Sequence, residues 1–161
     1  MATSEPYSVD KLTAEARRLA AEYRRATGKT LPLSAEIAVN DAIRLLALEL
    51  PGELNSGCDA LRRDQDSQVR VQVKGRVVFG DTKGTPRIGQ LKLDQSWDET
   101  VLVIMGEDYE PQEIYCATRT SIESVLEKKP SNKRGVMTLA QFKIIARREW
   151  TADDGLECHP Q

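Results

Sequence analysis

The spacing of apolar residues in the first third of the chain predicts two helices. In residues 9–26, apolar side chains recur every three or four positions with charged residues between them, the pattern of an amphipathic helix that ends at Gly28. Residues 34–50 are apolar around much of the helix circumference, so the second helix should be buried. Ser34 is suited to be its N-cap, and the carboxylate of Glu36 in the first turn suits the helix dipole.

Alternation with a period of two predicts strands in the middle of the chain. Residues 58–63 are expected to form a short strand, and residues 68–78 show the longest alternation in the sequence. In the longer strand the valines point to one face and the polar side chains to the other, so Gln72 and Lys74 are neighbours on the polar face. For this pattern alone, an ordinary half-exposed strand is the competing interpretation.

The rest of the chain predicts a sheet with helices packed against it. Strands are expected at residues 90–94 and 113–118, and the continuous apolar run at 100–105 is typical of a central strand covered on both faces. Helices fit residues 120–128 and 138–148. The expected fold class is therefore α/β (α+β), with a mixed central sheet flanked by helices.

A chain of 161 residues has room for one folded core. We expect an N-terminal helix and connector in residues 1–33, a core in residues 34–150, and a polar C-terminal tail in residues 151–161. No apolar run approaches the roughly 20 residues that span a bilayer, and the first residues lack the basic and apolar regions of a secretory signal. A cytoplasmic protein with no membrane association is the expectation.

Cysteine and histidine usage limits the chemistry that the chain can perform. The three cysteines, Cys58, Cys116 and Cys158, are scattered and odd in number, which favours neither a disulfide framework nor a zinc cluster. The single histidine, His159, lies in the polar tail, so a catalytic histidine is not expected. Any chemistry must use carboxylates, amides and lysines.

The distribution of charge is uneven along the chain. The formal net charge is −2, yet residues 128–148 hold seven basic residues and no acidic one. Such a stretch indicates either a solvated surface or a contact with nucleic acid. Trp97 and Trp150 could stack on bases, but a place in the core is the favoured interpretation for both.

Asp59, Gln72 and Lys74 form the candidate chemical group. If the strands at 58–63 and 68–78 pair as a hairpin, Asp59 approaches the face that carries Gln72 and Lys74. Mg²⁺ prefers oxygen ligands and needs only one or two carboxylates besides water and substrate oxygens. A lysine beside the metal can orient the attacking water or neutralise a phosphate. The group therefore holds the residue types that phosphodiester hydrolysis needs.

The order Gly57-Cys58-Asp59, a gap, and then Gln72-Val73-Lys74 resembles the core motif of the PD-(D/E)XK, or restriction-endonuclease-like, nuclease superfamily. Members commonly add an acidic residue on the preceding helix, where this chain has Glu36. The resemblance implies a restriction-endonuclease-like fold and a nuclease core within residues 34–150.

The same resemblance implies a role for each residue of the motif. Asp59, Gln72 and the backbone oxygen of Val73 would hold Mg²⁺ or Mn²⁺. Glu36 would assist metal binding, and Lys74 would position the nucleophile. Most members have an acid where this chain has Gln72, so metal binding would depend more heavily on the other oxygen ligands.

A second QxK pattern, Gln90-Leu91-Lys92, is preceded by Asp81. The first motif is favoured because its strand is longer and a plausible turn connects it to the strand of Asp59. Asp81, in contrast, lies in the Gly-rich segment 80–89. Lys92 is expected to contact phosphate instead.

Basic side chains near the motif could neutralise phosphates and bind nucleic acid without reading its sequence. They are Arg70, Arg76, Lys83, Arg87 and Lys92. The Gly-rich segment that holds two of them could follow a nucleic-acid backbone or be a plain surface loop.

The expected function is that of a metal-dependent DNA endonuclease, with host defence and DNA repair as candidate settings. A non-catalytic nucleic-acid-binding module and a protein-interaction domain on the same fold are the alternatives. A homodimer is a further candidate, because many members of the superfamily act as dimers.

Overall fold

The structure is a computed structural model that describes residues 9–53, 57–80, 84, 86–128 and 135–158. Its contacts divide the chain into two units. The first unit spans Met1–Leu33 and the second spans Ser34–Gln161. No helix among the described residues is long and apolar enough to cross a membrane.

In the part of the chain that the structure describes, four helices and eight strands follow one another. In order they are α1 (Val9–Thr27), α2 (Leu33–Leu46), β1 (Ala60–Asp64), β2 (Ser67–Val77), β3 (Arg87–Gln90), β4 (Glu99–Met105), β5 (Pro111–Thr118), α3 (Arg119–Glu127), β6 (Val136–Thr138), α4 (Leu139–Ile145), β7 (Arg147–Thr151) and β8 (Gly155–Leu156).

The first unit is built around helix α1, as the apolar spacing predicted. Its end also agrees with the prediction. Gly28 has φ +73° and donates its backbone N–H to the carbonyl oxygen of Arg24 at 2.8 Å. This left-handed residue after the helix closes the last turn, a conformation that glycine adopts without strain.

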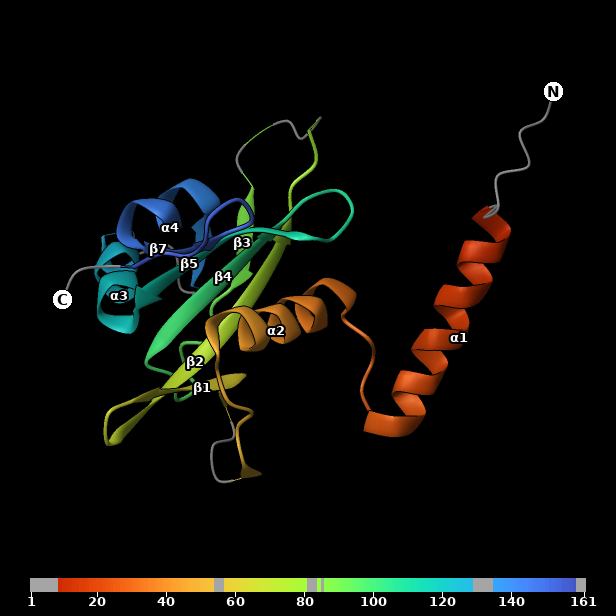
Figure 1. Ribbon diagram of the computed structural model, residues 1–161, viewed down its shortest axis with the longest axis horizontal. Helices are drawn as coiled ribbons and strands as arrows, with labels where there is room; N and C mark the ends of the chain where they lie inside the picture. Colours follow the sequence, from red (N-terminus) through yellow and green to blue (C-terminus); the bar gives the residue numbers. More distant parts are fainter. Residues whose placement is uncertain (1–8, 54–56, 81–83, 85, 129–134, 159–161) are drawn as a thin grey trace. The chain divides into compact units, whose positions relative to one another are not determined.

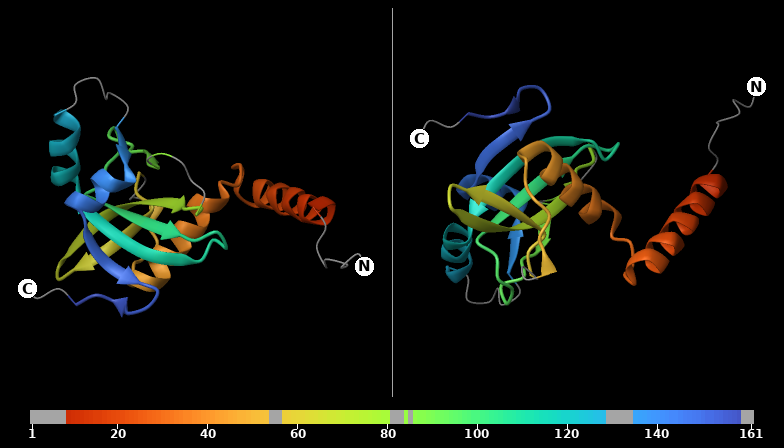
Figure 2. Two further views of the ribbon diagram at one scale, coloured as in Figure 1. Left: turned by 90° about the horizontal axis from the view of Figure 1, so that it is seen from above. Right: turned by 60° about the horizontal axis from the view of Figure 1, so that its bottom comes forward.

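The second unit contains a six-stranded sheet in the order β1-β2-β4-β5-β7-β8. Strands β2 and β4 are parallel, and the other neighbours are antiparallel. The connection between β2 and β4 contains β3, which pairs with β6 in a small separate sheet. The central sheet is twisted and has helices against it (Figures 1 and 2). The predicted fold class, a mixed central sheet flanked by helices, is confirmed.

Helix α2 covers one face of the central sheet, which we call the α2 face (Figure 1). Valines of β2 and β4 pack there against Ala38 and Ala42 of the helix. Close packing requires a glycine in β2. A Cβ added at Gly75 would lie 2.6 Å from the Cβ of Ala38 and 2.8 Å from the carbonyl oxygen of Ser34.

Helices α3 and α4 cover the opposite face, which we call the α3/α4 face. Its core contains the alternate residues of β4, Leu102 and Ile104, together with Trp97, Ile122 and Phe142. Both helices have a threonine N-cap. Both faces of β4 are buried, as its continuous apolar run predicted.

The C-terminal part of the chain differs from its prediction. The predicted helix at 138–148 ends at Ile145, and Arg147 and Arg148 lie on β7 instead. The polar tail was expected to begin at residue 151, but β8 pairs with β7 beyond it. The physical reason is tertiary, because β7 gains backbone hydrogen bonds from β5 that the helical spacing of the segment does not reveal.

Three further boundaries differ, and one is the end of α2, which was predicted at residue 50 but lies at Leu46. Helix α2 begins at Leu33, so Ser34 lies in its first turn rather than at the N-cap. The strand predicted at 90–94 is absent, because β3 ends at Gln90 and the chain then turns. The backbone N–H of Gln95 donates to the carbonyl oxygen of Lys92 at 3.1 Å within this turn.

Candidate functional site

Asp59 lies against the middle of β2, immediately before β1 begins. Its backbone N–H donates to the carbonyl oxygen of Val71 at 2.8 Å. Its carboxylate Oδ2 accepts a hydrogen bond from the backbone N–H of Val73, also at 2.8 Å. The two bonds hold Asp59 beside the stretch of β2 that contains Gln72, so the hairpin predicted from the sequence brings these residues together.

Gln72 is buried, although the sequence placed it on a polar strand face. Its side chain is only 2% exposed. Its amide oxygen Oε1 accepts a hydrogen bond from the Thr100 hydroxyl at 3.3 Å, and Thr100 is its neighbour across the parallel β2–β4 pair. The strand face that was predicted to be polar and accessible is therefore buried at this position, where the amide of Gln72 serves the core.

Lys74 is half-buried on the same face of β2. Burial lowers its pKa, because a desolvated ammonium group is less stable, and the positive charge of Lys92 lowers it further. The carboxylate of Asp59 acts in the opposite direction. Lys74 therefore lies within electrostatic range of one acid and one cation, and its proton is held less tightly than that of an ordinary lysine.

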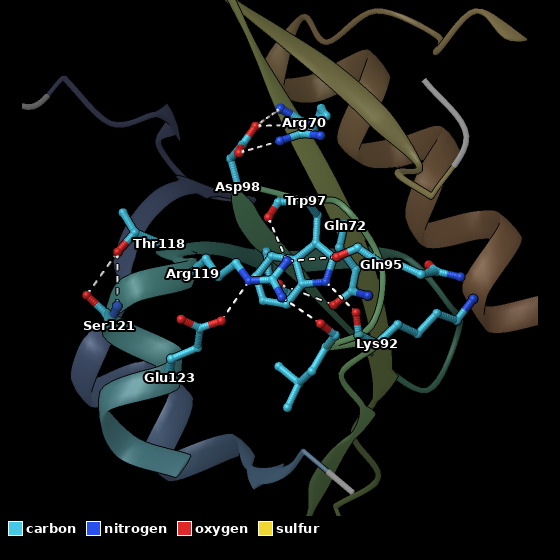
Figure 3. A network of polar contacts seen from close by, with 12 residues as sticks. Arg70, Gln72, Lys92, Gln95, Trp97, Asp98, Thr118, Arg119, Ser121 and Glu123 are labelled. Carbon is cyan, nitrogen blue, oxygen red and sulfur yellow. Dashed lines mark hydrogen bonds and ion pairs between the residues drawn. The ribbon is translucent and has the colours of Figure 1, made fainter. Parts of the chain in front are cut away.

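Residues 91–98 form an ordered loop, which we call the Arg119 loop because Arg119 holds it (Figure 3). The Arg119 guanidinium donates to the carbonyl oxygens of Leu93 at 2.6 Å and Gln95 at 2.7 Å, and lies 4.6 Å from the centre of the Trp97 ring. The indole N–H of Trp97 donates to the carbonyl oxygen of Lys92 at 2.7 Å. These bonds position Lys92 near Lys74.

Glu36 is outside this group. It is exposed in the first turn of α2, and α2 packs on the α2 face, whereas Gln72 and Lys74 belong to the α3/α4 face. The structure thus brings together Asp59, Gln72, Val73 and Lys74, and it leaves Glu36 apart. Within the described residues, no three histidine, cysteine or acidic side chains gather as a metal site.

The predicted nucleic-acid-binding cations divide into two kinds. Arg70 forms an ion pair with Asp98 at 3.1 Å, and the hydrogen bond from Arg70 holds the pKa of Asp98 below its usual range. Arg76, Arg87 and Lys92 are exposed, and in the described part of the chain no ion pair engages them. The predicted Lys83, and Asp81 of the second QxK pattern, lie outside the described residues.

The basic stretch at 128–148 is largely neutralised where the structure describes it. Lys143 pairs with Glu113 at 3.1 Å, and Arg147 pairs with Glu149 at 2.8 Å. Arg148 pairs with Glu157. Lys129, Lys133 and Arg134 lie outside the described residues. These paired cations are less available to a phosphate than those around Lys74.

Sequence reasoning missed several residues of this region. Arg119 carried no signal, because one arginine at the start of a helix is unremarkable before the loop that it holds is known. Phe79 and Tyr109 are exposed aromatic residues near the end of β2, at 44% and 37% exposure. Trp97 is 1% exposed, so the prediction that it belongs to the core is confirmed. Trp150 packs against the core of the α2 face, as predicted.

No family model and no curated protein matches the chain. The resemblance to the PD-(D/E)XK superfamily therefore remains a prediction from the motif residues.

Proposed function

We propose that the protein is a metal-dependent endonuclease that hydrolyses phosphodiester bonds in DNA. The observation that carries the proposal is the meeting of Asp59, the Val73 backbone and Lys74 at one place on β2. A carboxylate within electrostatic range of a lysine of lowered pKa provides the parts that charge neutralisation and proton transfer at a phosphate require.

The free cations around Lys74 support a phosphate-rich substrate. Arg76 lies two residues further along β2, and Lys92 lies on the Arg119 loop. Neither forms an ion pair within the described residues, whereas Arg62, Arg70 and Arg119 all do. A group of unpaired cations attracts a polyanion, and this attraction weakens as salt is added.

The oxygen atoms at the site are of the chemical type that Mg²⁺ and Mn²⁺ prefer as ligands. Asp59 uses Oδ2 to accept from Val73, and no described residue donates a hydrogen bond to its Oδ1. The backbone oxygen of Val73 and the amide oxygen of Gln72 would complete a ligand set of hard oxygen atoms. A bound metal would supply charge stabilisation at the phosphate and lower the pKa of a water molecule.

The chain's own residues have separate roles in this proposal. Lys74 faces the scissile phosphate and neutralises its charge, and its lowered pKa suits it to receive or release a proton. Lys92 acts through Lys74, because its positive charge disfavours the protonated form. Arg119 is a positioning residue, since it fixes the backbone of the loop that carries Lys92.

A second candidate function is nucleic-acid binding without hydrolysis. The burial of Gln72 and its hydrogen bond with Thr100 favour it, because an amide oxygen that is buried and already accepts a hydrogen bond is less accessible to a metal ion. The position of Glu36 favours it too, since among the described residues Asp59 supplies the one carboxylate within electrostatic range of Lys74. This candidate keeps the cations and their role but omits the metal.

Cleavage assays on the full chain distinguish the two candidates. The wild type is incubated with supercoiled plasmid, linear duplex, single-stranded DNA and RNA, with Mg²⁺ or Mn²⁺. We expect cleavage that falls at least about 100-fold in Lys74→Met and in Asp59→Asn. The control, Lys29→Met, removes an exposed cation outside the site and the basic stretch, and it should cleave as the wild type does.

The binding candidate predicts a different outcome. A folded wild type that cleaves no substrate with either metal, yet binds DNA in a salt-dependent manner, contradicts hydrolysis. In that case Arg76→Met should weaken binding, and Asp59→Asn should leave binding intact or improve it by removing a negative charge. Circular dichroism of each variant checks that the fold is retained.

A further inference from the structure

A hollow lies at the carboxyl end of β2, beyond Lys74. Its volume is about 220 Å³, below the roughly 300 Å³ at which pockets for drug-sized ligands begin. It therefore suits a single planar ring system. The lining residues are Ser34, Gly75, Arg76, Val77, Phe79, Pro86 and Tyr109.

Two aromatic side chains in this lining are exposed. Phe79 is 44% exposed and Tyr109 is 37% exposed, whereas Trp97 on the Arg119 loop is 1% exposed. Large aromatic side chains usually contribute to stability by burial, so rings that remain accessible at a hollow indicate a ligand that stacks on them. Every nucleobase offers a flat face for such stacking, whatever its sequence.

The backbone of Tyr109 gives an independent indication. Tyr109 has φ +64°, a left-handed conformation that a bulky residue rarely adopts and that glycine or asparagine adopts easily. Its N–H donates to the carbonyl oxygen of Gly106 at 3.0 Å, and the N–H of Gly106 donates to the carbonyl oxygen of Glu110 at 2.9 Å. The turn between β4 and β5 thus holds an aromatic residue where a smaller one would fit with less strain, as is typical of binding sites.

Arg76 connects the hollow to the site around Lys74. It lies two residues after Lys74 on β2, so their Cα atoms are about 7 Å apart and their side chains leave the same face of the strand. Arg76 lines the hollow and has no ion-pair partner among the described residues. Because Arg76 lines the hollow, its guanidinium can reach a phosphate of a strand that passes from the hollow toward Lys74.

We propose that this hollow is a nucleobase subsite, in which Phe79 and Tyr109 stack on a base and Arg76 binds the adjoining phosphate. The inference rests on the proposed function and adds a substrate class to it. A base inside a duplex is already stacked on its neighbours and cannot enter the hollow. The preferred substrate is therefore single-stranded or locally unpaired DNA.

The test uses the full chain and a short single-stranded oligonucleotide with one 2-aminopurine, in buffer with EDTA so that binding is measured without cleavage. Stacking on an aromatic ring quenches 2-aminopurine fluorescence. We expect quenching by the wild type, and a loss of quenching with about tenfold weaker binding in Phe79→Ala and Tyr109→Gly. Tyr109→Gly removes the ring and also the left-handed strain, so this variant should be at least as stable as the wild type.

Two controls make the test specific. Ile144→Ala removes an apolar side chain that is 83% exposed on α4 and does not line the hollow, so binding should be unchanged. An abasic deoxyribose-phosphate oligomer of the same length, which carries no base at all, should bind the wild type and Tyr109→Gly alike. Deoxyadenosine monophosphate should compete weakly, because the subsite takes a base that is part of a strand bound along the free cations.

The results test the nucleobase subsite and the proposed nuclease activity independently of each other. Unchanged quenching and affinity in both aromatic variants would overturn the subsite, even if the wild type cleaves DNA when metal is added. Equal affinity for the monophosphate and the oligonucleotide would also overturn it, since the hollow would then serve a free nucleotide. Aromatic-dependent quenching by a wild type that never cleaves would support the subsite and contradict the proposed nuclease.

Discussion

Arg62, next to the core on one face of the central sheet, has two carboxylate partners, whereas Lys74 on the other face has one carboxylate and a second cation within electrostatic range. On the α2 face, Arg62 forms ion pairs with Glu99 at 2.6 Å and with Glu149 at 2.9 Å. Burial alone would lower the pKa of Arg62, but the two carboxylates outweigh it and raise the pKa. On the α3/α4 face, the charged neighbours of Lys74 are Asp59 and a second cation, Lys92.

The difference separates structural charge from charge that is available for binding. The charges of Arg62, Glu99 and Glu149 neutralise one another through ion pairs. Cys116 beside them is an unreactive thiol because burial raises its pKa. Among the described residues, no carboxylate forms an ion pair with Arg76 or Lys92, so positive potential remains at a partly open surface. Substitutions on the α2 face should therefore affect stability, whereas substitutions around Lys74 should affect binding and cleavage.

The largest expected effect comes from Arg62→Met. The substitution leaves Glu99 without its ion-pair partner and removes one of the two partners of Glu149, which is 6% exposed. Breaking a buried ion pair from one side lowers the free energy of unfolding by about 3–5 kcal/mol. Urea denaturation at pH 7 measures the loss.

A neighbouring residue provides the matched control for Arg62. Arg63 is the next residue of β1, and its side chain is 67% exposed where it pairs with Glu49. Arg63→Met should change stability by less than about 1 kcal/mol, because exposed ion pairs contribute little. Similar losses of unfolding free energy in both variants would show that the ion pairs of Arg62 contribute no more to stability than an exposed ion pair does.

The next largest effect is expected from Gly75→Ala. The added Cβ would lie 2.6 Å from the Cβ of Ala38, so α2 must move away from β2. Such overpacking lowers the free energy of unfolding by about 1–3 kcal/mol. In Gly52→Ala, by contrast, the added Cβ meets nothing within 4 Å, and its thermal unfolding should match that of the wild type.

The smallest effect is a pH-dependent gain in Lys74→Met. Burial lowers the pKa of Lys74 in the folded chain, so below that pKa the charged side chain opposes folding. The penalty disappears as the pH rises to about 10.4, the ordinary value for lysine. We expect a gain of about 0.5 kcal/mol at pH 7 that shrinks as the pH rises through the lowered pKa of Lys74 and is gone above about pH 10.4.

Denaturant titrations at both pH values measure this difference, with Lys128→Met as the exposed control. A loss of stability in Lys74→Met at pH 7 would mean that the attraction of Asp59 outweighs burial and Lys92. The contrast between the two faces would then not hold. Cleavage by the same variant tests the other side of the contrast, since activity should fall while stability does not.

Local patterns predicted the central sheet well. The alternation around Val71 and Val73 identified β2, and the apolar run identified β4. Both patterns can be read directly from the sequence, because a half-buried strand alternates apolar and polar residues and a strand buried on both faces is continuously apolar. The helical spacing identified α1 and α3 within a residue or two. Arg147 was placed on a helix because the pairing of β7 with the distant β5 leaves no such local trace.

The candidate site was predicted in part. Asp59 meets the Gln72 and Lys74 stretch because a hairpin connects them, and a hairpin is a local structure that residue order can reveal. Arg70 was expected to be free for phosphate but is paired with Asp98, 28 residues later in the chain. Nothing in the local sequence around Arg70 indicates that partner.

The sequence by itself determined which residues of β2 share a face, since side chains alternate along any strand. It also determined the oxygen and amine groups that meet there, because a short turn joins the two strands that carry them. The tertiary structure alone decided that Gln72 is buried, that Lys92 lies within electrostatic range of Lys74 and that Glu36 is on the other side of the sheet. The physical reason is that periodicity assigns a side chain to a face, whereas distant segments such as the Arg119 loop and α2 decide what covers that face.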